Sequence, residues 1–210
     1  MAVDCDVNVL PRGVRHLPGQ LSALEQRALL EAIRDVVASA PLYRPVMPKT
    51  GRPLSVRMTN CGTLGWVSDV DGYRYQPTHP ETGEAWPPIP DALLALWREL
   101  DAYEHPPEAC LVNFYEGSAK MGLHQDRDED DLSAPVVSVS LGDDCLFRVG
   151  ETVRGGRTTS LRLRSGDVVV LGGAGRLAYH GVDRIYPATS ALLKRGGRIN
   201  LTLRRVTKPT

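Results

Sequence analysis

The sequence is poor in cysteine, has no excess of either charge and contains no long apolar run. Its four cysteines are widely spaced and form no C-x-x-C motif, which argues against a disulfide framework and against a structural zinc site. Its 25 basic side chains equal its 25 acidic ones in number, so no overall field would draw the chain to nucleic acid or to a membrane. A polyanionic partner would therefore need a local basic patch.

The signals of export and membrane insertion are also missing. No segment approaches the roughly 20 consecutive apolar residues that a spanning helix requires. Residues 1–13 have neither the basic start nor the apolar centre of a signal peptide. A length of 210 residues fits one domain with a substantial core. We expect a reduced, cytoplasmic protein and take it to be a monomer.

Helical patterns occur only in the first half of the chain. A capping box, Ser22 with Glu25 three residues later, predicts a helix that runs to about Ser39. Apolar residues at helical spacing predict a second helix over 91–103. A short strand is expected at 7–10. These elements carry no visible chemistry and are interpreted as scaffold.

From residue 110 onward the apolar period changes to two, which is typical of strands. The predicted strands cover 110–115, 136–142, 145–150, 160–164, 167–172 and 198–206. Many short strands separated by glycine turns indicate an antiparallel sandwich or barrel. The expected fold class is therefore mainly β with flanking helices.

Residues 41–90 look irregular, apart from a strand-like run at 55–60. Three aromatic residues in this region have two readings: Trp66, Tyr73 and Tyr75. They could anchor a long loop on the core, or they could act in binding, because loops often carry function.

The stretch 113–128 holds the first candidate for chemistry. His124 and Asp126 share one face of an extended segment, because side chains alternate along it. His180 follows a predicted strand and a glycine turn, and it would complete a 2-His-1-carboxylate iron site. The alternative for an isolated H-x-D is a surface ion pair. The other histidines stand near prolines and are expected to be solvated: His16, His79 and His105.

The C-terminal strand pattern points to a ligand for such a metal. Its polar face carries Arg198, Asn200, Thr202 and Arg204, and its apolar face carries Ile199, Leu201 and Leu203. Guanidinium groups grip carboxylates bidentately, so this face could receive one end of a dicarboxylate whose other end meets the metal. Asn113 and Tyr115 share a face and could bind the same molecule, 2-oxoglutarate. The alternative is a solvated edge strand.

At this point the run from Thr59 to Arg205 resembles the AlkB family of Fe(II)/2-oxoglutarate-dependent nucleic-acid demethylases. The matching motifs lie at 59–66, 72–75, 113–115, 124–142, 165–173, 176–181 and 198–204. The resemblance implies a double-stranded β-helix (jelly-roll) catalytic core over 105–210. It also implies an N-terminal helical and nucleotide-recognition segment over 1–104, packed on that core within a single integrated domain.

The resemblance assigns roles around the metal. It implies that Fe(II) is bound by His124, Asp126 and His180. Arg204 would hold the far carboxylate of 2-oxoglutarate, with Arg198 beside the metal-side carboxylate. The pocket would be completed by Asn113, Tyr115 and Asn200. One departure is Leu171, where the founding member of the family carries tryptophan.

The resemblance also assigns substrate residues. Trp66 would stack on the damaged base, with His124 on the opposite side, and Tyr73 would contact the nucleotide backbone. Asp128 matches a position near the exocyclic amine, and Arg154 matches a lesion-pocket arginine. Further phosphate contacts are expected among basic residues that could equally be solvated: Lys49, Arg52, Arg57, Arg74, Arg127, Arg157 and Arg162.

The implied activity is oxidative demethylation of 1-methyladenine and 3-methylcytosine in alkylated DNA, single-stranded in the first instance, with RNA as a further candidate. O2 and 2-oxoglutarate would be consumed, and formaldehyde, succinate and CO2 released. Two alternatives stay open. One is a hydroxylase of the same cofactor class acting on a protein or small molecule, and the other is a non-catalytic barrel that binds nucleic acid.

Overall fold

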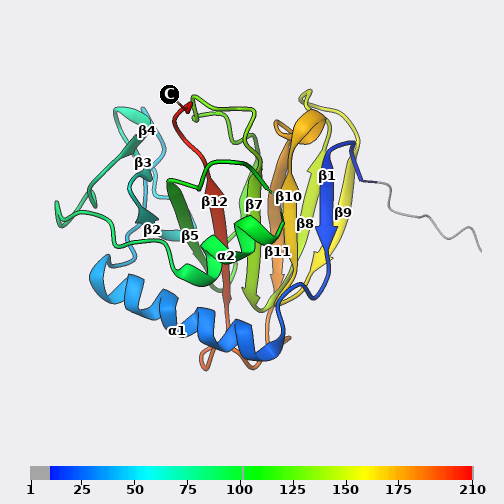
Figure 1. The fold of residues 1–210 in the computed structure, drawn as a ribbon, viewed down its shortest axis with the longest axis horizontal. Coiled ribbons are helices and arrows are strands. Elements are labelled where there is room, and N and C mark those ends of the chain that lie inside the picture. The colour runs from blue at the N-terminus through cyan, green and yellow to red at the C-terminus, as the bar shows by residue number, and fades with distance from the viewer. Residues whose placement is uncertain (1–9, 101, 210) are drawn as a thin grey trace, which may run out of the picture.

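The computed structural model describes residues 10–100 and 102–209 (Figure 1). The strand expected at 7–10 therefore falls, apart from its last residue, outside the described residues. Within them, no helix is long and apolar enough to cross a membrane.

A six-stranded antiparallel sheet forms the centre of the molecule, in the order β1-β10-β7-β12-β5-β2 (Figure 1). Its strands are β1 (Val14–Leu17), β10 (Val168–Leu171), β7 (Val136–Gly142), β12 (Arg198–Arg204), β5 (Ala109–Tyr115) and β2 (Arg57–Gly62). The C-terminal strand is thus an inner strand, hydrogen-bonded to β5 on one side and to β7 on the other. The alternative of a solvated edge strand is excluded.

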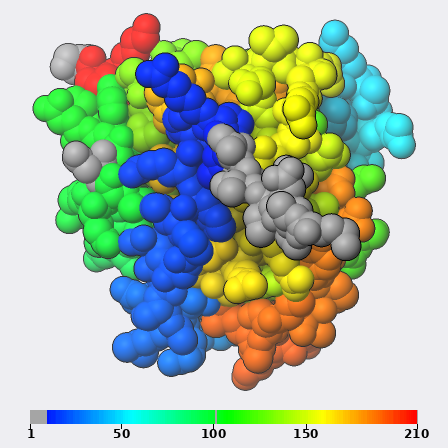
Figure 2. Space-filling view, turned by 90° about the vertical axis from the view of Figure 1, so that its right-hand side faces the viewer, coloured from blue at the N-terminus to red at the C-terminus, as the bar shows by residue number. Residues whose placement is uncertain are grey.

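A second, four-stranded sheet has the order β6-β11-β8-β9. Its strands are β6 (Met121–His124), β11 (His180–Tyr186), β8 (Asp144–Gly150) and β9 (Thr158–Leu163), and a 3-10 turn, η1 (Gly173–Gly175), precedes β11. Side chains from both sheets share one apolar cluster, in which Leu111 and Val136 of the first sheet join Phe147 and Val182 of the second. Figure 2 shows the side of the molecule where the blue N-terminal segment lies beside the yellow surface of residues around position 150. The predicted mainly β sandwich, a jelly roll, is confirmed.

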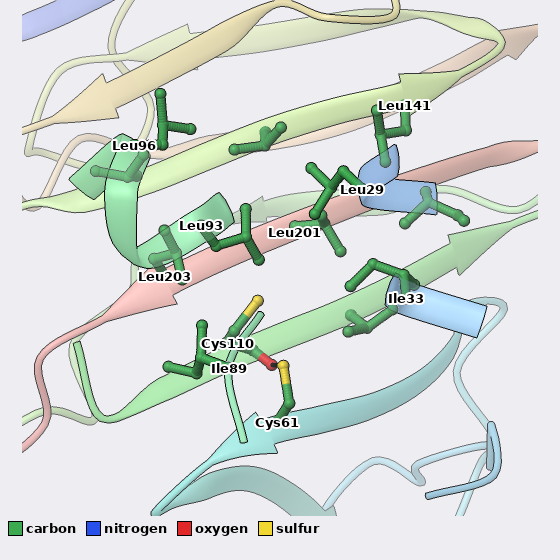
Figure 3. Packing of buried hydrophobic residues seen from close by; sticks show 14 of the residues in the cluster. Leu29, Ile33, Cys61, Ile89, Leu93, Leu96, Cys110, Leu141, Leu201 and Leu203 are labelled. Carbon is green, nitrogen blue, oxygen red and sulfur yellow. Dashed lines mark hydrogen bonds between the residues drawn. The ribbon is translucent and has the colours of Figure 1, made fainter. Parts of the chain in front are cut away.

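Two helices cover the outer face of the larger sheet (Figures 1 and 3). Helix α1 (Ala23–Ser39) begins at the predicted capping box, with Ser22 and Glu25 satisfying each other's backbone groups. Its Leu29 and Ile33 pack on the apolar face of β12, at Leu201 (Figure 3). Burial of that face drives this layer together.

Helix α2 (Asp91–Glu99) is shorter than the predicted 91–103. The indole Nε1 of Trp97 donates to the carbonyl oxygens of Tyr103 and His105 at 3.3 and 3.1 Å. These hydrogen bonds hold the segment around residues 103–105 against the side of the helix, so it does not continue the helix. Two prolines at 106–107 follow, which cannot donate backbone hydrogen bonds.

The region expected to be irregular contains a hairpin, β3 (Gly65–Asp69) with β4 (Gly72–Gln76). Its turn is closed by the Asp71 backbone N–H, which donates to the Asp69 side chain at 2.9 Å. A Cβ on Gly65 would stand 2.5 Å from the Trp86 ring, so only glycine allows this close packing. The sequence did not predict these strands, because polar and aromatic residues are mixed along them without an apolar period of two.

The N-terminal half of the chain contributes strands to the larger sheet. It supplies β1 at one edge of the larger sheet and β2 at the other. The hairpin projects beyond β2 (Figure 1).

The structure shows how deeply the histidines and cysteines named in the sequence analysis are buried. His79 was expected to be solvated, and this prediction is wrong: its side chain is 1% exposed, between Tyr43 and Trp86. The two other histidines expected to be solvated are half-buried: His16 and His105. Three cysteines are buried free thiols, which confirms a packing role for Cys110 and Cys145 and extends it to Cys61. Cys61 and Cys110 lie close together beneath the helices (Figure 3).

Candidate metal and cosubstrate site

A cavity of about 740 Å³ lies between the two sheets. Strands β5 and β12 form one wall, and β8 and β11 contribute to the other. The polar face of β12 lines this cavity, as its alternation predicted.

Three side chains meet in the cavity. His124 ends β6 and His180 begins β11, and the two residues are paired across these strands. Asp126 follows two residues after β6. Its carboxylate oxygens lie 3.6 Å from the Nε2 atoms of His124 and His180. One ligand atom from each residue lies within 4.8 Å of the others, which is the arrangement that the H-x-D and distant histidine predicted.

Both histidines are oriented by a hydrogen bond on the opposite side of the ring. The Nδ1 atoms lie 2.9 Å from backbone carbonyl oxygens, of Gly122 for His124 and of Ala178 for His180. A carbonyl can only accept, so each Nδ1 carries the proton and each Nε2 presents its lone pair to the cavity. These are the donor atoms that a divalent metal needs.

The carboxylate of Asp126 is held from one side only. Its Oδ1 accepts from Nη2 of Arg204 at 2.8 Å, whereas its Oδ2 is buried without a hydrogen-bond partner. A buried unpaired carboxylate oxygen is costly, and a metal ion between the two histidines would satisfy it. The residues therefore fit Fe(II), for which two histidines and one carboxylate leave coordination positions open.

Electrostatics keep the ligands in their binding forms. Burial raises the pKa of Asp126, but the opposing charge of Arg204, followed by the two histidines, holds that pKa well below its usual range. Burial and the neighbouring His124 lower the pKa of His180 to about 4. Asp126 is therefore ionised and His180 neutral at physiological pH.

Arg198 stands at the other end of β12, fully buried beside Tyr115. Its Nη2 donates to Ser140 Oγ at 2.7 Å and its Nη1 to the carbonyl of Asp143 at 3.3 Å. Its Nε has no partner, and no carboxylate among the described residues lies within 4.0 Å of it. A buried guanidinium without a counter-charge fits an anionic ligand.

The order of the two arginines differs from the sequence expectation. Arg204 was expected at the far carboxylate and Arg198 near the metal, whereas in the structure it is Arg204 that touches Asp126. Alternation places both residues on one face but does not say which end of that face meets the metal. Asn113, whose Oδ1 is buried and unpaired, and Asn200 line the cavity between them.

The predicted substrate residues gather at the cavity. Trp66 and Tyr73 come from the hairpin, and their rings stack at 5.4 Å. The indole Nε1 of Trp66 donates to Oδ2 of Asp128 at 2.9 Å. Tyr73 and Asp128 are exposed, and Arg154, also exposed, lines the same cavity.

Asn60 of β2 fixes the backbone of Trp66. Its Oδ1 accepts from the Trp66 N–H and its Nδ2 donates to the Trp66 carbonyl, both at 3.0 Å. Asn60 is completely buried, so the aromatic platform is tied directly to the central sheet.

Sequence reasoning missed a second set of connected polar residues, of which Glu129 and Arg176 are buried and Tyr75 is half-buried. Tyr75 was named only as a possible loop anchor. Its hydroxyl donates to Glu129 Oε1 at 2.5 Å and accepts from Arg204 Nη1 at 3.0 Å. Glu129 and Arg176 form a buried ion pair at 3.0 Å. The motif positions 124–142 and 176–181 contain two of these residues, but no spacing rule reveals that they meet.

Three of the arginines named as phosphate contacts have acidic partners in the structure. The pairs are Arg57–Glu116 at 3.2 Å, Arg74–Asp69 at 2.7 Å and Arg162–Asp144 at 2.9 Å. Exposed pairs of this kind contribute little.

The fold and site are those of a metal-dependent oxygenase. Residues 13–204 match the family model of the 2OG-Fe(II) oxygenase superfamily. The chain is 56% identical over 190 residues to an alpha-ketoglutarate-dependent dioxygenase AlkB homolog of Caulobacter vibrioides, covering 90% of this chain and 85% of that protein. It is 44% identical over 195 residues to the alpha-ketoglutarate-dependent dioxygenase AlkB of Escherichia coli, covering 89% and 87%.

More distant comparisons agree. The solved structure of OsALKBH1 superposes with a TM-score of 0.78 at 33% identity, covering 94% of this chain and 100% of that one. The tRNA demethylase abh1 of Schizosaccharomyces pombe is 33% identical over 141 residues, which cover 65% of this chain and 47% of that protein. The chain belongs to the AlkB family of 2-oxoglutarate-dependent dioxygenases. Iron, 2-oxoglutarate and O2 are the cofactor and cosubstrates of this class, and His124, Asp126 and His180 form the metal site.

Proposed function

We propose that this protein repairs alkylated nucleic acid by removing N-linked methyl groups from 1-methyladenine and 3-methylcytosine. Single-stranded DNA is the primary substrate and RNA a further one; succinate, CO2 and formaldehyde are the products. The observation that carries the proposal is the stacked Trp66 and Tyr73 platform, which is hydrogen-bonded to Asp128 two residues beyond the metal ligand Asp126. The name of the tRNA demethylase relative supports the same substrate class.

The cosubstrate is held by the buried face of β12. Arg198 pairs with the far carboxylate of 2-oxoglutarate, because its buried guanidinium has no acidic partner among the described residues, and Tyr115 across the strand pair adds a hydroxyl. Arg204 stands at the metal-side carboxylate, and Asn113 and Asn200 hydrogen-bond between the two ends. A fork at each end of a dicarboxylate fixes its orientation.

The substrate base is held at the cavity mouth. Trp66 stacks on it and His124 flanks its other side, so the base must be unpaired or flipped out of a duplex. A base methylated at these positions carries positive charge, which favours stacking on an indole and approach to the carboxylate of Asp128. Tyr73 contacts the nucleotide backbone and Arg154 the rim of the pocket. The segment 1–104 is thus the recognition segment, since it carries the hairpin.

When bound, iron and 2-oxoglutarate supply the oxidation of the N-methyl carbon by O2. The protein's part is to place that carbon next to the metal and to exclude water from it. The resulting N-hydroxymethyl group releases formaldehyde and leaves the unmodified base. Only modest affinity, strongly dependent on salt, is expected from a chain without net charge.

A direct assay tests the proposal. The protein is incubated with Fe(II), 2-oxoglutarate and a single-stranded oligonucleotide that carries 1-methyladenine or 3-methylcytosine. Formaldehyde and the repaired base are expected in equal amounts. Bound iron with no repair, together with succinate release stimulated by a protein or small molecule, would instead identify a hydroxylase of another substrate.

An inactive variant separates catalysis from binding. Asp126→Ala is expected to abolish turnover, because the metal loses its carboxylate ligand, while binding of the oligonucleotide largely survives. Unchanged function of this variant would favour the non-catalytic barrel.

For compartment and assembly, the proposal is a cytoplasmic monomer. Three described cysteines that stay unpaired suit a reducing environment. Light scattering of the purified protein tests the assembly state.

A further inference from the structure

Glu129 is a buried carboxylate that touches neither the metal ligands nor the cavity. Its side chain is 0% exposed, and it is surrounded by two hydrogen-bond donors and by one further guanidinium nitrogen, which makes an ion pair with it. Tyr75 OH lies at 2.5 Å, Arg176 Nη2 at 3.0 Å, and Arg204 Nε at 3.5 Å. An ionised carboxylate is buried only when such partners compensate it.

The first route from Glu129 to the metal site runs through Arg204. Nε of that guanidinium faces Glu129 and Nη1 donates to the Tyr75 hydroxyl at 3.0 Å. Nε makes no hydrogen bond, so its contact with Glu129 is an ion pair. Because the guanidinium is planar and rigid, this ion pair and the Tyr75 hydrogen bond together orient Nη2 toward Asp126 Oδ1, at 2.8 Å.

The second route runs through Arg176 to the backbone of the same aspartate. Arg176 is 3% exposed. Its Nη1 donates to the carbonyl of Asp126 at 2.6 Å and its Nε to the carbonyl of Ala134 at 2.7 Å. Glu129 therefore reaches Asp126 at its side chain and at its main chain, by two independent contacts.

We infer that Glu129 is a positioning residue for the metal centre. Two buried guanidiniums, of Arg204 and Arg176, are balanced by two buried carboxylates, of Glu129 and Asp126. Without the charge of Glu129, both guanidiniums would face Asp126 alone and compete with the metal for its oxygens. The inference concerns the metal site and does not depend on the nature of the substrate.

A purely structural carboxylate in the same region provides a matched control. Glu108 accepts from the backbone N–H groups of Val206 and Thr207 at 2.9 and 2.7 Å, just beyond β12. It also pairs with Arg205 at 3.3 Å, and it does not line the cavity. Its loss should affect folding stability without reaching Asp126.

The test uses the full chain, freed of metal, with Mn(II) as a stand-in that does not turn over with O2. The Kd for Mn(II) is measured by electron paramagnetic resonance of the free ion, and the Kd for 2-oxoglutarate is measured separately at saturating Mn(II). Glu129→Gln is expected to weaken Mn(II) binding by about tenfold or more, as loss of an outer-shell partner does, with a smaller change for 2-oxoglutarate. Glu108→Gln is expected to bind Mn(II) as the wild type does.

Equal Mn(II) affinity in the Glu129→Gln and Glu108→Gln variants would overturn the inference. If Glu129→Gln shows no cooperative unfolding transition, the Mn(II) affinity of Tyr75→Phe is measured in its place. It removes only the hydroxyl that joins Glu129 to Arg204, and it should weaken Mn(II) binding by about fivefold, the equivalent of one hydrogen bond. An unchanged Mn(II) Kd in that variant overturns the inference as well.

Discussion

The indole Nε1 of Trp66 lies 2.9 Å from Oδ2 of Asp128, and this hydrogen bond joins the β3–β4 hairpin to the loop that carries the metal ligand Asp126. The two residues are 62 positions apart in the chain. The stacking surface and the reactive centre are therefore held at a fixed separation by a side-chain contact as well as by the sheet.

Asp128→Asn should separate the two contributions of that carboxylate. The amide oxygen can still accept from the indole, so the platform stays in place, but the negative charge is lost. The preference for a 1-methyladenine oligonucleotide over its unmethylated counterpart should fall by roughly fivefold, the upper range for an exposed charge. Fluorescence anisotropy with both oligonucleotides measures it. An unchanged ratio in Asp128→Asn, with Asp128→Ala also unchanged, would contradict a role in recognising the cation.

The two arginines of β12 should fail in different ways. Arg198→Gln removes the guanidinium that is proposed to bind the far carboxylate, so the KM for 2-oxoglutarate should rise by about tenfold or more. The affinity of this variant for Mn(II) should stay close to that of the wild type. Arg204→Gln should weaken both, because it also touches Asp126. Titration of metal and cosubstrate in turn distinguishes them. Identical profiles for the two variants would show that their positions along β12 do not divide these tasks.

Asn60→Ala should disconnect the platform from the sheet. Both of its hydrogen bonds go to the backbone of Trp66, and their loss leaves buried groups unpaired, at a cost of about 1–3 kcal/mol. Chemical denaturation measures this loss, and oligonucleotide binding should weaken with it. The three metal ligands lie on β6, on β11 and in the loop after β6, so the affinity for Mn(II) should change less than oligonucleotide binding does. A loss of stability with normal oligonucleotide binding would mean that Trp66 keeps its place without the clamp.

The metal-free protein should lose stability in mildly acidic solution. The pKa of His180 is lowered from 6.5 to about 4 by burial and by His124. Above pH 6.5 the residue is neutral in both states; between pH 6.5 and 4 only the unfolded chain takes up the proton, so stability falls across this window. The loss should be of order 2–3 kcal/mol. Asp126 adds its own loss only below its ordinary pKa of 3.8.

His180→Gln is the control for that pH dependence. Urea denaturation of the metal-free variant should show a flatter curve between pH 6.5 and 4 than the wild type does. A slope as steep as that of the wild type would assign the acid sensitivity to other groups.

Much of the site could be predicted because it depends on local periodicity. The H-x-D spacing put His124 and Asp126 on one face, and period two put Arg198 and Arg204 together on β12. The capping box located the start of α1 for the same reason, since its hydrogen bonds join residues three apart.

What escaped prediction depends on contacts between distant segments. Tyr75 and Glu129, which share a hydrogen bond, are 54 positions apart. The buried ion pair of Glu129 with Arg176 likewise leaves no periodic pattern in the sequence. His79 stands among prolines in the sequence, yet its neighbours in space are Tyr43 and Trp86. The hairpin was missed because neither of its strands shows an apolar alternation: β3 is largely buried and β4 is partly exposed.

Strand β12 presents Leu201 and Leu203 to the helices and two guanidiniums to the cavity, while hydrogen-bonded on both sides. A slip of one residue in its pairing would exchange the two faces, driving charge into the leucine layer and leucine into the cosubstrate pocket. No misregistered form could retain part of the activity. A shift of register in this one strand would therefore remove the cosubstrate pocket and the packing beneath the helices together.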